Sequence, residues 1–205
     1  MLLAGLSRWP NLFPPNFSAF YGLAFCAGAF FCGPMKWWLP LGTILVSDVC
    51  LDLYYLHLGY QVFDLPLLRY QLCNYVAFAV LIWLGKRFNP RSSFRYLLAG
   101  GLLGAVLFYF ITNTASWLFN PFGNLEYTRD LKGWLIALTM GTQGWPHTWE
   151  FFRNTLLSGG LFTGLFAGAM KLTESAESAK EKATEKEQAP ESEAEPNTAP
   201  DEAGA

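Results

Sequence analysis

Two acidic residues stand inside one long apolar run of this sequence. Asp48 and Asp52 occur within ILVSDVCLDLYYL, whose other residues are mostly those of a membrane-spanning helix. Residues four apart are neighbours on one face of a helix, and a charged side chain at mid-bilayer depth costs roughly 2.5–3.5 kcal/mol. We therefore expect this pair either to line a water-accessible cavity, as a ligand, cation or proton site, or to tie neighbouring helices together.

A second polar cluster, ITNTASW, interrupts another apolar run and contains Asn113. Two carboxylates as close as Asp48 and Asp52 disfavour each other's ionised form unless a base or an amide lies between them, and Asn113 is a candidate for that role. Hydroxyl side chains in such a run can return hydrogen bonds to their own backbone. The Asn113 amide should have a specific partner, either across a helix interface or on a ligand.

The elements that position these groups are membrane helices. Hydrophobic residues make up 52% of the chain and charged residues only 15%, whereas a soluble domain carries about 25% charged residues. The pattern predicts an all-α, polytopic transmembrane helix bundle of five to six spans. The clear spans are residues 17–32, 37–58, 67–84, 96–118 and 151–172.

Two shorter apolar stretches leave the number of spans open. Residues 133–145 would cover about 20 Å as a helix, less than the ~30 Å hydrocarbon core, so this stretch is a tilted span, a re-entrant piece or an interfacial helix. Residues 1–6 look like the last turns of a helix whose beginning is missing.

The last part of the chain has a different composition from the bundle. Residues 173–205 contain ten acidic residues and three lysines, a net charge of −7, and no aromatic or branched aliphatic residue. Such a segment cannot bury enough apolar surface to offset its chain entropy. We predict a helical bundle over residues 1–172 and a disordered acidic tail over residues 173–205.

Basic residues predict the orientation in the membrane. The loop KRFNPRSSFR, residues 86–95, is the densest basic loop and has no acid, so we place it in the cytoplasm. The turn at Asp64 and residues 120–132 then face outward. The C-terminus is cytoplasmic if residues 133–145 do not cross, and external if they do.

The sequence shows no set of residues for covalent chemistry. It has no P-loop, dinucleotide-binding glycine motif or H-E-x-x-H. Its four cysteines lie in apolar runs without a C-x-x-C spacing. We therefore expect no enzyme activity, no cofactor and no metal site.

Several short motifs, taken in order, resemble a known family. They are RWPNLFPPNFSAFYGLAFCAGAFF from Arg8, SD at Ser47–Asp48, ITNTASW, YTRDLKG and FFRNTLLSG. Together they resemble an uncharacterised bacterial family of integral-membrane proteins described as transport proteins, which is in turn similar to the substrate-binding S components of energy-coupling-factor (ECF) transporters. The chain departs from the family pattern at Ala19, where a proline is usual, and at Ser158–Gly159, where Gly-Asp is expected.

The resemblance implies a protein of the bacterial cytoplasmic (inner) membrane with a small-molecule pocket near its outer face. Residues 8–18, 120–132 and 145–154 would roof that pocket, and a transmembrane coupling subunit and ATPases would be partners. Our leading hypothesis is the capture of a small metabolite or vitamin from outside for uptake. The alternative is a non-transporting membrane scaffold or assembly subunit. The candidate ligand contacts are Asn16, Asp48, Asn113, Trp117, Tyr127, Asp130 and Asn154.

Overall fold

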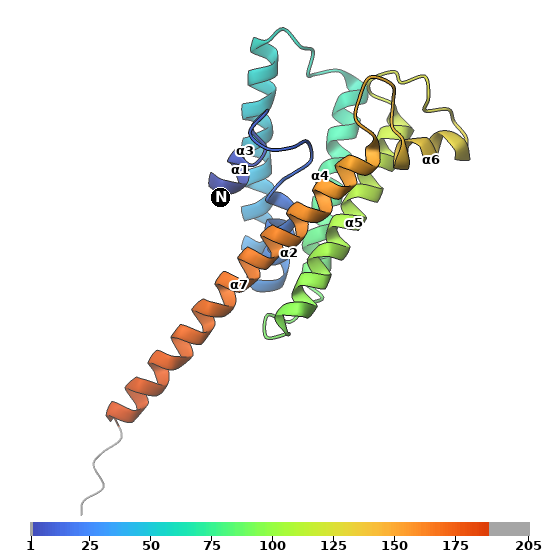
Figure 1. Ribbon diagram of the computed structural model, residues 1–205. Helices are drawn as coiled ribbons and strands as arrows, with labels where there is room; N and C mark the ends of the chain where they lie inside the picture. The colour runs from blue at the N-terminus through green and yellow to red at the C-terminus, as the bar shows by residue number, and fades with distance from the viewer. Residues whose placement is uncertain (1, 189–205) are drawn as a thin grey trace, which may run out of the picture. The chain divides into compact units, whose positions relative to one another are not determined.

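The regular elements of the described chain are all helices, as the apolar pattern predicts (Figure 1). The computed structural model describes residues 2–188. Contacts divide the chain into one compact unit, Met1–Met170, and a second unit from Lys171 onward. The site described below lies entirely in the first unit.

Among residues 2–188, four helices are long and apolar enough to cross a membrane. They are α3 (Met35–His57), α4 (Leu65–Gly85), α5 (Phe94–Phe119) and α7 (Thr148–Gln188), of which the apolar part is Thr148–Ser178. At 1.5 Å per residue, α3, α4 and α5 measure about 35, 32 and 39 Å. These helices confirm the long apolar helices predicted at residues 37–58, 67–84, 96–118 and 151–172, and by length and composition all four could span a membrane.

The span expected at residues 17–32 is instead the short helix α2 (Phe20–Phe30). Its eleven residues cover about 16 Å, and ten of the eleven are buried. Glycines allow this burial: a Cβ on Gly28 would lie 2.1 Å from the Ile82 carbonyl oxygen of α4, and one on Gly22 would lie 2.5 Å from the Thr163 nitrogen of α7. A helix with apolar residues on every face is typical of one that is enclosed by protein or lipid, and protein encloses α2.

The stretch at residues 133–145 does not form a crossing helix. Helix α6 (Leu131–Thr139) has nine residues, about 14 Å, and turns at Gly141 and Gly144, both with positive φ, lead into α7. Further along α7, Gly164 and Gly168 lie beside Phe94 at the start of α5. The part of α7 around Gly164 and Gly168 is therefore at the same end of the bundle as the start of α5, which follows the basic loop.

Helix α7 continues to Gln188, past the expected boundary at Leu172. Glutamate, alanine and lysine are strong helix formers, so this segment can extend a helix without an apolar face to bury. Residues 189–205 of the expected tail lie outside the described residues. At the other end of the chain, residues 2–6 form the five-residue helix α1 (Leu2–Leu6).

Candidate functional site

A groove of about 310 Å³ lies between α3 and α4. These two helices are consecutive and run antiparallel (Figure 1). Half of the groove lining is aliphatic and half is polar, within helices that are otherwise strongly apolar. The lining residues are Leu45, Asp48, Val49 and Asp52 from α3, and Leu68, Gln71, Leu72 and Tyr75 from α4.

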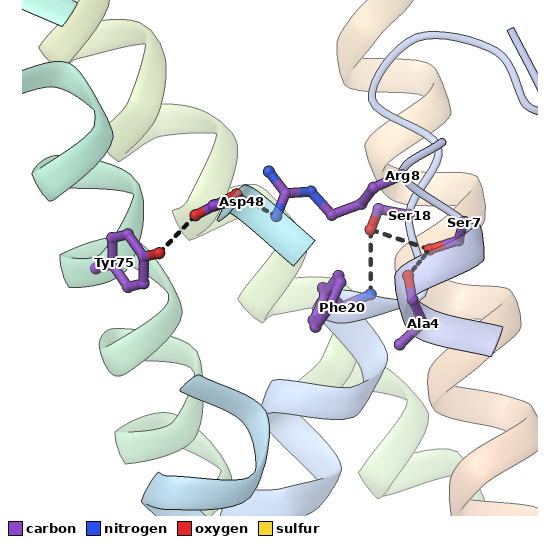
Figure 2. Close-up of polar contacts among 7 residues, drawn as sticks. All are labelled: Ala4, Ser7, Arg8, Ser18, Phe20, Asp48 and Tyr75. Atoms are coloured by element: carbon purple, nitrogen blue, oxygen red, sulfur yellow. Dashed lines mark hydrogen bonds and ion pairs between the residues drawn. The ribbon is translucent and has the colours of Figure 1, made fainter. Parts of the chain in front are cut away.

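Both carboxylate oxygens of Asp48 have a partner in the protein (Figure 2). The Arg8 guanidinium forms an ion pair with one oxygen, and the Tyr75 hydroxyl donates a 2.6 Å hydrogen bond to the other. Asp48 is buried, with 7% of its surface exposed. A buried charge needs an opposite charge and hydrogen bonds to offset its lost hydration, and these two partners supply them from two other elements.

Arg8 reaches Asp48 from the segment that connects α1 to α2. Its guanidinium also lies 5.7 Å from the centre of the Phe20 ring, a cation–π contact. The segment is held at both ends by serines. Ser7 Oγ donates to the Ala4 carbonyl at 2.7 Å, and Ser18 Oγ accepts from the Phe20 amide at 3.2 Å (Figure 2). Ser7 Oγ also accepts from the Ala19 amide at 2.9 Å. These contacts fix the Arg8 backbone at the start of the buried helix α2.

Asp52 lies one helical turn beyond Asp48 and is half-buried. The Gln71 side chain of α4 lines the same groove. Within the described residues Asp52 has no ion-pair partner. The two acids on one face of α3 thus have different surroundings: one is neutralised by the protein and the other is accompanied by an amide and a phenol.

Asn113, the partner expected for these acids, has another role. Its side-chain amide donates a 2.8 Å hydrogen bond to the Tyr109 carbonyl one turn earlier in α5. The structure gives Asp48 the partners Arg8 and Tyr75 instead. The Asn113 amide therefore finds a hydrogen-bond acceptor in the backbone of its own helix. The Thr112 hydroxyl does the same, donating to the Phe108 carbonyl.

Trp117 and Asp130 organise the loop between α5 and α6. Trp117 Nε1 donates to the Thr128 carbonyl at 2.7 Å. Asp130 caps α6, accepting from Thr128 Oγ1 at 2.6 Å and from the Gly133 amide at 2.7 Å. These hydrogen bonds, the Thr128 one first, hold the pKa of the Asp130 carboxyl below its usual value. Burial raises the pKa of Tyr127 in the same loop.

Asn16 and Asn154 lie where the segment between α1 and α2 meets α7. Asn154 of α7 donates to the Pro15 carbonyl at 3.0 Å. Asn16 has a positive φ of 60°, and its carbonyl accepts from the Tyr21 hydroxyl at 3.2 Å. This corner fastens the segment between α1 and α2 to the last span.

The seven candidate residues therefore fall into separate places. Asp48 lines the α3–α4 groove, Asn113 bonds within α5, Trp117 and Asp130 close the α5–α6 loop in which Tyr127 also lies, and Asn16 with Asn154 joins two segments. Sequence reasoning missed Arg8, Gln71 and Tyr75. A signal for the last two was present in YQLCNY, where polar side chains recur once per turn within the apolar run of α4.

The polar side chains of the groove carry oxygen atoms that can form hydrogen bonds with a bound solute. Within the described residues, no group of three or more histidine, cysteine, aspartate or glutamate side chains is placed to hold a metal ion. The side chains present are suited to hydrogen bonds and charge pairing with a small solute.

Residues 1–183 match a family described as a family of unknown function (DUF6580). The match covers most of the chain, so the chain belongs to this family. No curated protein matches it, and no solved structure matches it.

Proposed function

We propose that this member of the DUF6580 family captures a small polar metabolite in the α3–α4 groove and delivers it for uptake, without covalent chemistry. The observation that carries the proposal is the polar half of the groove lining, formed by Asp48, Asp52, Gln71 and Tyr75 within two candidate membrane spans. Polar and ionisable side chains at membrane depth are expensive, and they usually face a cavity or a solute pathway.

The depth of the groove supports access from the outer side. Asp48 lies about 20 Å along α3 from Met35, and Gln71 lies about 9 Å along α4 from Leu65, at 1.5 Å per residue. Both positions are nearer to the connection between α3 and α4 than to the opposite ends of these helices. The basic loop at residues 86–95 predicts that this connection faces outward.

The energy for uptake would come from partners. The sequence has no nucleotide-binding motif, and the resemblance to ECF S components suggests a transmembrane coupling subunit with ATPases in a bacterial inner membrane. We include these partners and this location in the proposal.

A non-transporting scaffold or assembly subunit is the second candidate function. One observation favours it: the side chains of Asn113, Trp117, Asp130 and Asn154 all bond to backbone of their own chain. Under this alternative, polar groups in the spans stabilise the bundle and bind no solute.

Native mass spectrometry of gently purified protein in lipid nanodiscs tests the proposal. We expect the wild type to retain a small molecule and Gln71→Leu, which removes a polar groove group without unpairing a charge, to lose at least nine-tenths of it. Gln61→Leu, at an exposed loop position, is the matched control and should retain it. If wild type retains no small molecule and Gln71→Leu changes only thermal stability, the scaffold function is supported instead.

A further inference from the structure

The polar side chains of the groove offer hydrogen-bond acceptors to a ligand. Tyr75 has a single hydroxyl hydrogen, which it donates to Asp48, so its oxygen has only lone pairs left for a solute. An ionised Asp52 is an acceptor only, and the Gln71 side chain brings a carbonyl oxygen that also accepts. A ligand that forms hydrogen bonds with these acceptor atoms must therefore supply the donor groups.

The charged groups around the groove also favour a ligand that donates hydrogen bonds, because they carry a net negative charge. Asp48 and Asp52 come from α3, Arg8 comes from the segment before α2, and the lining residues of α4 carry no charge. With Arg8 paired to Asp48, one negative charge remains at Asp52. In a site of low dielectric this charge favours a cationic solute and disfavours an anionic one.

Arg8 illustrates how a cation is held beside this groove. Its guanidinium pairs with the Asp48 carboxylate and lies over the Phe20 ring. Asp52 and Tyr75, which line the groove together with Asp48, present the same two kinds of group, a carboxylate and an aromatic ring. The protein thus already binds one guanidinium with the chemistry that the groove repeats.

We propose that the substrate of the groove is a small organic cation, an amine or an amidine-type compound with a short apolar body. Its cationic head would bind Asp52 and the Tyr75 oxygen, and its body would lie against Leu68 and Leu72. The volume of about 310 Å³ is at the small end of ligand sites. This inference rests on the proposed function, because it names the solute class of the same site.

Three probes of nearly equal shape test the charge preference: benzamidinium, benzamide and benzoate. Their dissociation constants are measured by calorimetry on the full chain in nanodiscs, for wild type, Asp52→Asn and the control Asp64→Asn. Asp64 is an exposed acid in the turn before α4. We expect wild type and Asp64→Asn to bind benzamidinium at least tenfold more tightly than benzamide and to show no benzoate binding. Asp52→Asn should lose this preference.

The outcomes separate this inference from the proposed function. If benzamide or benzoate binds as tightly as benzamidinium and Gln71→Leu weakens that binding, the groove binds solutes but the cationic class is wrong. If benzamidinium binds equally to wild type and Asp52→Asn, the head is not held at Asp52 and the inference is overturned. If no probe binds wild type, the inference is also overturned, and the retained molecule seen by mass spectrometry decides the proposed function.

Discussion

Arg8 and Asp48 form an ion pair that joins the segment before the buried helix α2 to the first long span, α3. The Arg8 side chain is one-quarter exposed, whereas the Asp48 side chain is 9% exposed. The pair therefore places a carboxylate with two partners at one wall of the groove, whereas the second acid of α3, Asp52, has no ion-pair partner among residues 2–188. This difference between two acids on one helix face is the basis of the inferred preference for a cationic solute.

Breaking this pair from one side should cost more stability than removing both charges. We expect Arg8→Met to lower the free energy of unfolding by less than the roughly 3–5 kcal/mol of a fully buried pair, because Arg8 is partly exposed. Adding Asp48→Asn should recover part of the loss, because the uncompensated charge is then gone. Unfolding in detergent measures both variants, with Arg91→Met in the exposed loop as the control. Additive effects of the two substitutions would contradict a coupled pair.

Close packing of α2 against α4 should tolerate no side chain at Gly28. An alanine Cβ there would lie 2.1 Å from the Ile82 carbonyl oxygen, a backbone atom that cannot move away without shifting α4. We expect Gly28→Ala to abolish the monodisperse peak in size-exclusion chromatography. Gly42→Ala on α3 is the matched control, because no atom lies within 4 Å of its added Cβ. Normal behaviour of Gly28→Ala would show that α2 is not enclosed as described.

Acid should loosen α6 by protonating its cap. Hydrogen bonds from Thr128 and Gly133 lower the pKa of Asp130 in the folded state. A carboxyl with a lowered folded pKa stabilises the fold above its unfolded pKa, about 3.9, and that contribution is lost as the pH falls through the folded value. Hydrogen exchange at Gly133 should therefore accelerate below about pH 4 in wild type, beyond the intrinsic pH dependence of exchange.

Asp130→Asn provides the comparison for this prediction. Asparagine also caps helices well but has no carboxyl to titrate. Exchange at Gly133 in this variant, corrected for the intrinsic rate, should stay constant through the same pH range. An equal acceleration in both proteins would place the acid sensitivity outside Asp130.

The long spans could be predicted from the sequence because a lipid-facing helix needs both length and apolar composition. Helix α2 could not be separated from them, since an apolar run is the same whether lipid or protein surrounds it. Its small residues, which let α4 and α7 approach closely, were the feature of the sequence that indicated a buried helix.

The candidate site was predictable only in part. Asp48 was identifiable because an acid in an apolar run is unusual. Its partners were not, because Arg8 and Tyr75 lie far from it in the chain and only the packing of α2, α3 and α4 brings them together. Polar residues such as Asn113 and Asn154 carry the same sequence signal, yet their hydrogen bonds are to nearby backbone or to another loop.

The central claim is that polar groups of α3 and α4 surround a groove that opens to the outer side. Thiol labelling in right-side-out vesicles tests it most directly, using Gln71→Cys in a background with the four native cysteines replaced by alanine. Val76→Cys is the matched control, because Val76 is on α4 and exposed but does not line the groove. We predict that a membrane-impermeant cationic methanethiosulfonate modifies position 71 at least tenfold faster than position 76. Equal protection of both positions would contradict an outwardly open groove.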